Sequence, residues 1–363
     1  MRVLGVMSGT SLDAVDYVIV SFSPAGEIRF EEHWQVSFPA RLRRDLLAAA
    51  SGQATSWQTG QLHHDLGRFY ALGAKRAQVE LAGLHGQTIF HRPNRSAPAT
   101  FQIGEPAYLA ETLRIPVVSN FRAADLAAGG QGAPLATLFH ARVFARKGRH
   151  VAVNNLGGIS NVTSLDWRLN QEPAVLSFDT GPANLLIDLA VQRFTRGKSG
   201  FDRGGRLARR GAIDHRAVER WLKHPFFRQS PPKSTGRERF GAAFLDRVAN
   251  QLAGPDLIAT LAEFTARSIA LNYRLHLGAI PDRVILCGGG AENPFLRERL
   301  DEALRDRRGE IEVLGSAELG WRPETIEGAA FALLAWLRWK DQPGNIPSTT
   351  GARRACVLGQ VTG

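Results

Sequence analysis

The sequence predicts a mixed α/β protein with two lobes, and three observations lead to this class. Predicted strands and helices alternate along the chain. A strand, a turn of small residues and a returning strand open both halves, at 3–22 and at 150–165. The length of 363 residues is enough for two domains, each with its own core. Because hairpins are common, the repeat alone is weak evidence for duplicated domains.

In the first half, apolar β-branched runs predict strands and amphipathic stretches predict helices. The opening hairpin has strands at 3–7 and 15–22 around a turn at 8–13. Further strands are expected at 29–38, 82–90 and 116–119, and helices at 41–50, 59–81, 106–113 and 135–147. The glycine-rich connection 128–134 is the first candidate for a hinge between domains.

The second half repeats this order of elements. Strands are expected at 150–156, 159–165, 174–178 and 282–287, and helices at 185–195, 256–277, 295–307 and 325–339. Segment 196–241 is basic and rich in loops, with two helical pieces, and we interpret it as a solvated face.

Charge and composition argue against several classes of protein. The net charge is +11, but the basic residues are scattered and no nucleic-acid-binding module is recognisable, so no nucleic-acid partner is expected. The longest apolar run, 329–337, is too short to span a membrane, and the N-terminus does not resemble a secretory signal. Cys287 and Cys356 provide neither a disulfide framework nor a metal cluster. We therefore expect a reduced, cytoplasmic protein.

Several common motifs are missing. Segment 197–199 has the Gly-Lys-Ser end of a P-loop, but Gln192 stands where the leading glycine belongs. The chain has no G-x-G-x-x-G, and the turn at Ser8 does not match the nucleophile elbow. The histidines of the first half do not form an H-E-x-x-H pattern, so no metal site is expected there.

The turn of the first hairpin, SGTSLD at 8–13, has almost no side-chain bulk. Glycine lets a ligand approach the backbone closely, and consecutive N–H groups with three hydroxyls form a nest for anionic oxygens. Asp13 and Asp16 would suit a hydrated Mg²⁺ held against a phosphate. The alternative is an ordinary hairpin turn in which serine and aspartate are turn formers.

Two further glycine turns lie at 157–158 and 288–290. The second follows a predicted strand and precedes a helix that begins near Asn293. Backbone amides and a helix N-terminus in that position suit an anionic or planar group. A tight crossover that needs positive φ angles is the alternative interpretation.

Polar side chains at the ends of predicted strands are the remaining candidates. Asp179 follows a strand and precedes a helix, which suits a general base or, equally, a turn or helix cap. His85, Gln87 and Thr88 would suit a sugar or another polyol, or could satisfy one another. Glu327 lies in the first turn of the last long helix, where a negative charge is favoured whatever the function.

Taken together, these segments resemble the anhydro-N-acetylmuramic acid kinases of bacterial peptidoglycan recycling. Ordered motifs carry the resemblance nearly from end to end. They are MSGTSLDAVD (7–16), LHGQTIFHRP (84–93), FQIGEP (101–106), NFRAADLAAGGQGAPL (120–135), NNLGGISNVT (154–163), SFDTGPANLLID (177–188), PKSTGRERF (232–240), CGGGAENPFL (287–296) and PGNIPSTTGA (343–352).

The resemblance implies an actin-like ATPase fold, with two lobes of duplicated ribonuclease-H-like architecture, mixed sheets and an active-site cleft between the lobes. The implied lobes are 1–127 with about 340–363, and 128–339. Family members use ATP and Mg²⁺ to open the 1,6-anhydro ring with water and to phosphorylate the freed O6. The expected partners are therefore anhydro-N-acetylmuramic acid, ATP and water, with a homodimer left open.

The resemblance also implies roles for matching residues. Asp179, in the DTGP motif, would be the general base that activates water, and Asp13 would hold Mg²⁺ through water. ATP is expected at Gly9, Thr10, Ser11, Leu12, Asp13, Ala14, Val15 and Asp16, at Gly157 and Gly158, and at Gly288, Gly289, Gly290 and Asn293. The sugar is expected at His85, Gln87, Thr88, Arg122, Thr180, Asn184 and Glu327.

The chain departs from the family pattern at three positions. Ala14 and Ala183 stand where the family commonly has glycine, and Glu105 stands where it has aspartate. The two alanines matter only if their positions need positive φ angles. Two other functions stay open, a nucleotide-gated ATPase of the actin or chaperone type and a kinase of another small sugar.

Overall fold

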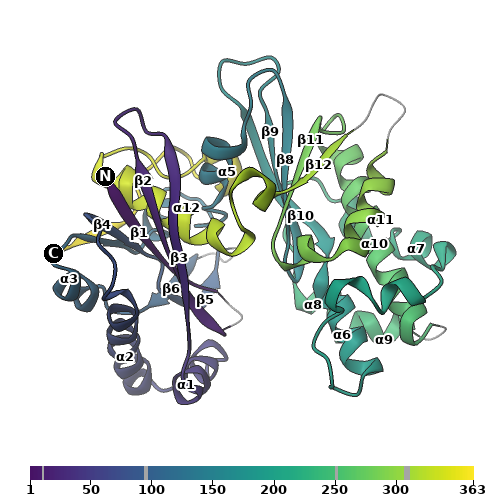
Figure 1. Ribbon diagram of the computed structural model, residues 1–363, viewed down its shortest axis with the longest axis horizontal. Helices are drawn as coiled ribbons and strands as arrows, with labels where there is room; N and C mark the ends of the chain where they lie inside the picture. Colours follow the sequence, from purple (N-terminus) through teal and green to yellow (C-terminus); the bar gives the residue numbers. More distant parts are fainter. Residues whose placement is uncertain (10–11, 94–96, 250–251, 306–310) are drawn as a thin grey trace. The chain divides into compact units, whose positions relative to one another are not determined.

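The computed structural model describes residues 1–9, 12–93, 97–249, 252–305 and 311–363. The chain divides into two compact units. The first unit comprises Met1–Val143 and Glu324–Gly363, so both chain ends belong to it (Figure 1), and the second comprises Phe144–Pro323. The candidate hinge, 128–134, lies within the first unit. The lobe limits implied by the resemblance stay predictions.

The first unit is built on a six-stranded sheet with the order β13-β7-β4-β1-β2-β3. The central hairpin β1–β2 and its neighbour β3 are antiparallel, whereas β4 and β7 continue the sheet parallel to β1. The strands are β1 (Arg2–Ser8), β2 (Ala14–Phe22), β3 (Ile28–Ser37), β4 (Leu81–Leu84), β7 (Val117–Ser119) and β13 (Gln360–Thr362).

The second unit is built on a five-stranded sheet with the order β10-β9-β8-β11-β12. Its hairpin β8–β9 and the neighbour β10 are antiparallel, and β11 and β12 run parallel to β8. The strands are β8 (His150–Leu156), β9 (Ile159–Asp166), β10 (Ala174–Pro182), β11 (Arg283–Cys287) and β12 (Glu312–Gly315). Each unit therefore has the ribonuclease-H-like arrangement of three antiparallel strands followed by two parallel ones, and the predicted duplication of the fold is confirmed.

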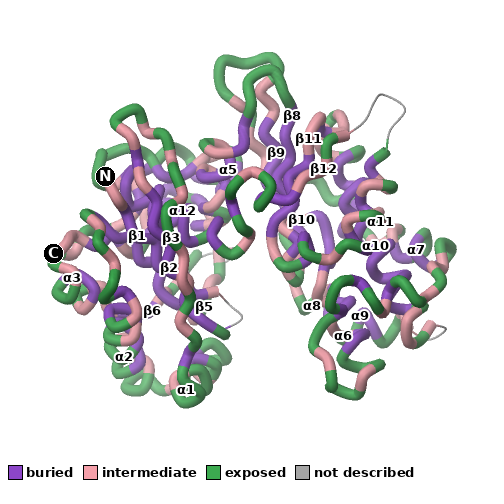
Figure 2. Tube along the Cα trace, viewed as in Figure 1, coloured by how far each residue is buried: buried purple, intermediate pink, exposed green. Residues whose placement is uncertain are grey.

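Helices cover both faces of the first sheet. Its central strands β1 and β2 are largely buried, whereas the edge strand β3 is intermediate or exposed (Figure 2). On one face, α12 (Pro323–Trp339) approaches so closely that a Cβ atom at Gly5 would overlap the carbonyl oxygen of Gly328. On the other face, the Tyr17 hydroxyl donates to the carbonyl oxygen of Tyr70 in α2 (Ser56–Ala74) at 3.2 Å. The hairpin strands β1 and β2 are thus packed against helices on both faces of the sheet.

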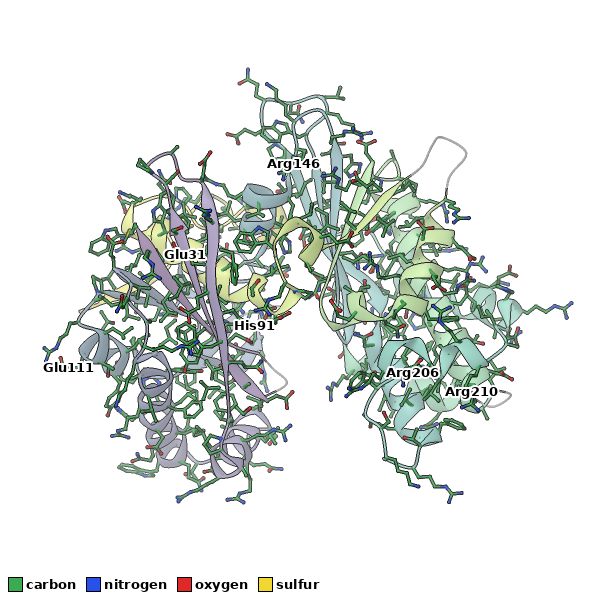
Figure 3. All side chains as sticks on the ribbon, viewed as in Figure 1. Glu31, His91, Glu111, Arg146, Arg206 and Arg210 are labelled. Atoms are coloured by element: carbon green, nitrogen blue, oxygen red, sulfur yellow. The ribbon has the colours of Figure 1, made fainter. Side chains whose placement is uncertain are left out.

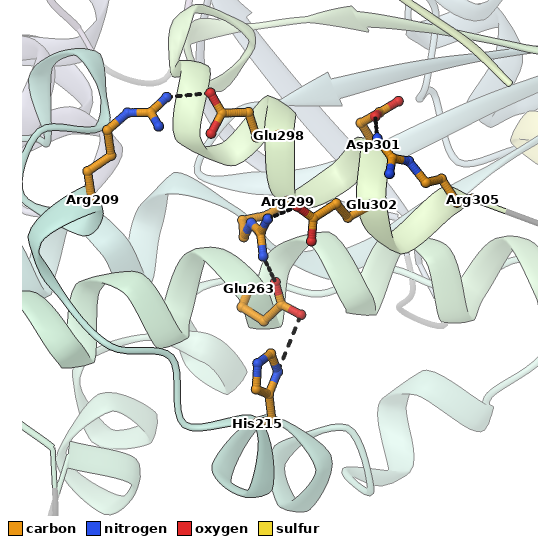
Figure 4. A network of polar contacts seen from close by, with 8 residues as sticks. All are labelled: Arg209, His215, Glu263, Glu298, Arg299, Asp301, Glu302 and Arg305. Carbon is orange, nitrogen blue, oxygen red and sulfur yellow. Dashed lines mark hydrogen bonds and ion pairs between the residues drawn. The ribbon is translucent and has the colours of Figure 1, made fainter. Parts of the chain in front are cut away.

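Charged side-chain contacts join helices of the second unit to α10 (Gly254–His276). The buried carboxylate of Glu263 in α10 lies 3.8 Å from Arg299 of α11 (Pro294–Leu304) and 3.8 Å from His215 of α7 (His215–Trp221). Figure 4 shows this network. A buried charge needs such partners, because an unpaired one is costly to desolvate.

The remaining elements lie outside the two large sheets. They are α1 (Ala40–Ala50), β5 (Gln87–Arg92), β6 (Ala99–Ile103), α3 (Ala107–Leu113), α4 (Ala123–Ala127), α5 (Thr137–Phe144), α6 (Asn184–Phe194), η1 (Arg203–Gly205), η2 (Ala208–Arg210), η3 (Pro225–Arg228), α8 (Arg237–Phe240), α9 (Ala242–Val248), η5 (Gly289–Glu292), η6 (Ser316–Leu319) and α13 (Pro347–Thr350). Among the described residues, no helix is long and apolar enough to cross a membrane.

Several expected elements differ from the structure. The single strand expected at 82–90 is wrong, because Gly86 has a φ of +77° and divides it into β4 and β5. β5 pairs with β6, which was not expected, in a sheet of two strands. The helix expected at 59–81 ends at Ala74. The strand expected to end at Phe178 continues to Pro182 through a bulge at Thr180.

Candidate active site

In the turn of the second hairpin, Gly157-Gly158, both glycines have space for a larger side chain. Neither glycine has a positive φ angle. A Cβ atom at Gly157 would lie 3.4 Å from the carbonyl oxygen of Ile159, and one at Gly158 would lie 3.7 Å from the Cβ of Leu185. Packing therefore tolerates a side chain at both positions. Glycine here supports the prediction of a phosphate loop, since it keeps the backbone open to a ligand.

For the third glycine turn, Gly288–Gly290, the structure supports the tight crossover and leaves room for a ligand site as well. Gly288 has a φ of +77°, and a Cβ atom at Gly288 or Gly290 would collide with Leu156 at the end of β8. Gly289 faces open space within the described structure. Asn293 caps α11, because its Oδ1 accepts hydrogen bonds from two backbone N–H groups at 3.1 and 3.3 Å. Two of the three glycines are needed for the crossover, and the contact of this turn with adenosine stays a prediction.

The first hairpin turn is shaped by Leu12 and Arg43. Leu12 has a φ of +56°, and its carbonyl oxygen accepts from Arg43 Nε at 2.9 Å. The same guanidinium donates from Nη2 to Asp13 Oδ1 at 2.9 Å. Thr10 and Ser11 lie outside the described residues.

Further along this hairpin, Ala14, Val15 and Asp16 belong to β2. Asp16 Oδ1 lies 2.8 Å from His33 Nε2 and accepts from Gln35 at 3.2 Å. Its carboxylate is therefore tied to β3.

Asp13 fits the predicted magnesium ligand. Its side chain is 66% exposed at the end of the turn, so its oxygens can reach a hydrated ion. Magnesium usually keeps several waters and binds one or two carboxylates together with substrate phosphates. Within the described residues, no group of three or more His, Cys, Asp or Glu side chains could hold a metal by itself. A single exposed carboxylate matches an ion that arrives with a nucleotide.

Asp179 is held by two backbone groups of one segment. Its N–H donates to the carbonyl oxygen of Lys233 at 3.0 Å, and its Oδ2 accepts from the N–H of Thr235 at 2.8 Å. Burial raises the pKa of Asp179 to about 6, the Thr235 N–H opposes the rise, Glu238 adds to it and Lys233 opposes it. The carboxylate is therefore mostly ionised at pH 7 yet more basic than usual, which suits a general base.

Thr180 and Asn184 follow Asp179 and bond within the protein. The Thr180 hydroxyl donates to Ser160 Oγ at 2.6 Å, and Asn184 Nδ2 donates to the carbonyl oxygen of Leu156 at 2.9 Å. These bonds fix the ends of β8 and β9 beside Asp179. Contacts of both side chains with the sugar stay predictions.

In the first unit, Arg122, His85 and Glu327 interact. Arg122 Nη2 lies 2.9 Å from His85 Nε2, and Nη1 donates to the carbonyl oxygen of Gly132 at 2.6 Å. Burial and the Arg122 charge lower the pKa of His85 well below its usual value, so the neutral ring accepts this bond. Burial lowers the pKa of Arg122 to about 10, against the effect of Glu327. Glu327 keeps solvent access, and desolvation raises its pKa while Arg122 opposes the rise.

Three buried polar atoms of this region have no partner among the described residues. They are His85 Nδ1, Gln87 Oε1 and Arg122 Nε. Thr88 Oγ1, by contrast, accepts from Gln102 at 3.2 Å. Because buried polar groups are usually satisfied, unpartnered donors and acceptors in one region indicate a polar ligand. The sugar contacts predicted for these residues are compatible with that chemistry.

None of the three departures from the family pattern stands at a positive φ angle. Ala183 has a φ of −123°, and Ala14 lies in β2 without a positive φ. Glu105 starts α3, where its Oε1 accepts from the N–H of Ala107 at 2.9 Å and its Oε2 lies 3.1 Å from His63 Nε2. Neither alanine therefore stands at a position with a positive φ angle, the case in which glycine would be favoured.

Sequence reasoning assigned no role to Lys233 and Thr235. Segment 196–241 was interpreted as a solvated face, which suits the exposed Arg206 and Arg210 (Figure 3) but is wrong for Lys233, which is buried. The motif PKSTGRERF at 232–240 was the available signal. Its contact with Asp179 joins residues 56 positions apart, which no local pattern reveals.

Comparisons with known proteins agree along the whole chain. The family model of anhydro-N-acetylmuramic acid kinase matches residues 1–363. A relative from Picosynechococcus sp. named anhydro-N-acetylmuramic acid kinase is 42% identical over 382 residues, which cover 99% of each chain. A relative of the same name from Gloeobacter violaceus is 43% identical over 376 residues, covering 99% of this chain and 97% of the relative.

Solved structures are more distant. The activator of the 2-hydroxyisocaproyl-CoA dehydratase from Clostridium difficile, with bound ADPNP, has a TM-score of 0.43 and 12% identity, covering 94% of this chain and 96% of that one. A ROK family glucokinase from Streptomyces griseus, in complex with glucose and AMPPNP, has a TM-score of 0.39 and 16% identity, covering 93% and 99%. These scores add nothing to the fold established from the sheets. On its full-length match and its relatives, the chain belongs to the anhydro-N-acetylmuramic acid kinase family.

Proposed function

We propose that this protein is an ATP-dependent kinase of anhydro-N-acetylmuramic acid that acts in peptidoglycan recycling. Membership of the family and the names of relatives at about 40% identity support the kinase activity and its sugar substrate. The finer part of the proposal is that phosphorylation is coupled to hydrolysis of the 1,6-anhydro ring. The product is then N-acetylmuramic acid 6-phosphate.

The proposed chemistry assigns one proton transfer to Asp179. Its carboxylate takes a proton from a water molecule as the water oxygen bonds to the anomeric carbon. The bond between that carbon and the bridging oxygen breaks, and the oxygen, now O6, bonds to the γ-phosphorus of ATP as ADP leaves. Backbone N–H groups of the glycine turns at Gly9 and at Gly157-Gly158 would stabilise charge on the phosphates.

The remaining residues bind and orient. Asp13 would hold Mg²⁺ through water, and the ion would neutralise charge on the transferred phosphoryl group. Arg122 would bind the lactyl carboxylate or the amide of the sugar, and Gln87 and Glu327 its ring substituents. Gly288–Gly290 and Asn293 would meet the adenosine.

The observation that carries this proposal is the environment of Asp179. Its carboxylate is held by a backbone N–H at 2.8 Å, and burial raises its pKa to about 6. A nucleotide-gated ATPase without a sugar substrate would not need a base for water attack on a sugar. The family match argues in the same direction.

The test combines the protein with Mg-ATP and 1,6-anhydro-N-acetylmuramic acid in ¹⁸O water, and mass spectrometry follows the sugar. A phosphorylated product with one ¹⁸O at the anomeric carbon is expected from the wild type. Asp179→Asn should bind ATP with unchanged affinity and lose turnover by a factor of about 10²–10⁴, the usual contribution of a general base.

Three results would contradict the proposal or part of it. ATP hydrolysis that continues while the anhydrosugar is not consumed would favour the nucleotide-gated ATPase. Phosphorylation of another small sugar in preference to the anhydrosugar would favour the third alternative. A phosphorylated product without ¹⁸O would separate kinase activity from ring hydrolysis and refute the coupling.

A further inference from the structure

We propose that Lys233 is a positioning residue for this reaction. Its ammonium group anchors segment 230–236, and this segment holds the carboxylate of Asp179 in the orientation that proton transfer from water requires. The inference rests on the proposed role of Asp179 as the general base. It concerns a residue of the second unit for which the sequence analysis gave no role.

Segment 230–236 contacts Asp179 through two of its own backbone groups, the carbonyl of Lys233 and the N–H of Thr235. The carbonyl oxygen of Lys233 accepts from the Asp179 N–H at 3.0 Å, and the Thr235 N–H donates to Asp179 Oδ2 at 2.8 Å. In a pair of strands, a backbone carbonyl oxygen would accept the hydrogen bond from the Thr235 N–H. Here the carboxylate of Asp179 accepts it instead. Any shift of the segment moves the carboxylate with it.

The segment itself has little regular structure to hold it. Residues 230–236 belong to no helix or strand. Its main side-chain attachment is Lys233, whose Nζ donates to the carbonyl oxygens of Phe226 at 3.3 Å and Phe227 at 3.2 Å. His276 Nε2 of α10 lies 3.1 Å from the same nitrogen.

These contacts match the chemistry of a lysine side chain. An ammonium group has three N–H donors and no acceptor, and the two carbonyl oxygens take two of these donors. His276 Nε2 lies 3.1 Å from Nζ and 3.1 Å from the Phe227 carbonyl oxygen, so the ring joins the same cluster as an acceptor from the lysine or as a donor to the carbonyl. Lys233 Nζ also lies 4.8 Å from the centre of the Phe226 ring, a cation–π distance. The two carbonyl oxygens and the face of the Phe226 ring offset the cost of burying the charge. A shorter or uncharged side chain would leave carbonyl oxygens without donors and release the segment.

Charge gives Lys233 a second effect on Asp179. The groups that face Asp179 are Lys233, whose charge lowers its pKa, and Glu238 of α8, whose charge raises it. The groups that face Lys233 are Asp179 and His276. Loss of the lysine charge should therefore move the pKa of Asp179 upward, and with it the acid limb of the activity profile.

The experiment measures kcat, the KM for ATP and the pH dependence of kcat/KM for Lys233→Met in the full-length enzyme. Methionine keeps the length of the side chain and removes the charge and the donors. We expect kcat to fall by about 10- to 100-fold, the usual effect of misplacing a catalytic group, with the KM for ATP nearly unchanged. The acid limb should shift to higher pH. The matched control is Lys223→Met, which removes an exposed lysine of the same unit and should behave as wild type.

A second pair of variants covers the case in which Lys233→Met does not fold. His276→Leu removes the ring nitrogen that contacts both Lys233 Nζ and the Phe227 carbonyl oxygen, whereas His276→Gln keeps an amide that can accept from the first or donate to the second. We expect His276→Leu to lower kcat and His276→Gln to restore most of it. Equal kcat values in this pair, or a folded Lys233→Met variant with wild-type kcat and acid limb, would overturn the inference.

Asp179→Asn, measured in parallel, separates the inference from the proposed function. If Asp179→Asn keeps wild-type turnover, the role of Asp179 fails, and the inference fails with it. If Asp179→Asn is inactive while both Lys233→Met and His276→Leu turn over normally, only the inference fails.

Discussion

Asp179 illustrates how a functional group opposes stability at the scale of one residue. Burial raises the pKa of its carboxyl to about 6, so the folded protein binds this proton more tightly than the unfolded chain does. The stabilising contribution is complete below the ordinary aspartate pKa of about 4 and is lost as the pH rises through 6. At neutral pH the fold therefore carries a partly buried negative charge that asparagine would not have.

Asp179→Asn should consequently increase the free energy of unfolding at pH 8. The expected gain is about 1–2 kcal/mol, since each pKa unit corresponds to about 1.4 kcal/mol and the group keeps some solvent access. The gain should shrink as the pH falls from 6 toward 4. Urea denaturation of both proteins at pH 8 and pH 5 measures it. A gain that is equal at both pH values would contradict the raised pKa.

Residues differ in how far the sequence could identify them. The resemblance points to Asp179 because the DTGP motif is contiguous. The PKSTGRERF motif marks Lys233 but does not reveal its role. That role depends on contacts with Phe226, Phe227 and His276, which only the folded chain brings together. The partner of Asp13 was hidden for the same reason, since Arg43 lies 30 positions away.

At the scale of elements, the sequence predicted best where a strand is apolar and uninterrupted. The strand expected at 150–156 agrees with β8, and the opening hairpin agrees within one residue. The single strand expected at 82–90 was wrong because apolar residues on both sides of the segment suggested one continuous strand, whereas Gly86 in its middle adopts a left-handed conformation. Short edge strands such as β6, β12 and β13 carry too few residues for a periodic pattern and are recognisable only from their partners.

The packing of α12 on the first sheet gives a prediction at this scale. Gly5→Ala would press a methyl group against the backbone of Gly328 and should lower the free energy of unfolding by about 2–4 kcal/mol. The matched control is Gly60→Ala in α2, an exposed helix position with open space around it. That change should raise stability by about 0.5–1 kcal/mol. Equal effects of the two changes in thermal denaturation would refute the close contact.

At the scale of the whole molecule, the first unit is assembled from distant segments. Asp125 of α4 joins them, because its Oδ1 accepts from Asn345 at 2.6 Å and from Thr350 at 2.7 Å while its Oδ2 accepts from the Gly132 N–H at 2.7 Å. The carboxylate is fully buried. All its donors belong to the first unit.

Asp125→Ala tests whether the two units unfold independently of each other. It removes a buried acceptor of three hydrogen bonds and should cost about 2–4 kcal/mol. Hydrogen exchange followed by mass spectrometry should show faster exchange in peptides of Met1–Val143 and Glu324–Gly363 and unchanged exchange in Phe144–Pro323. Equal acceleration in both would mean that the molecule unfolds as one cooperative body.

The pairing of β13 with β7 has a consequence for the nascent chain. The strand β13, Gln360–Thr362, lies after the second unit in the chain and pairs with β7 of the first sheet. The second unit is complete in sequence before Glu324–Gly363 is made, although it comes later in the chain than the first hairpin. During translation, the second unit therefore has all of its residues before the first unit does, because the first unit also needs the segment Glu324–Gly363.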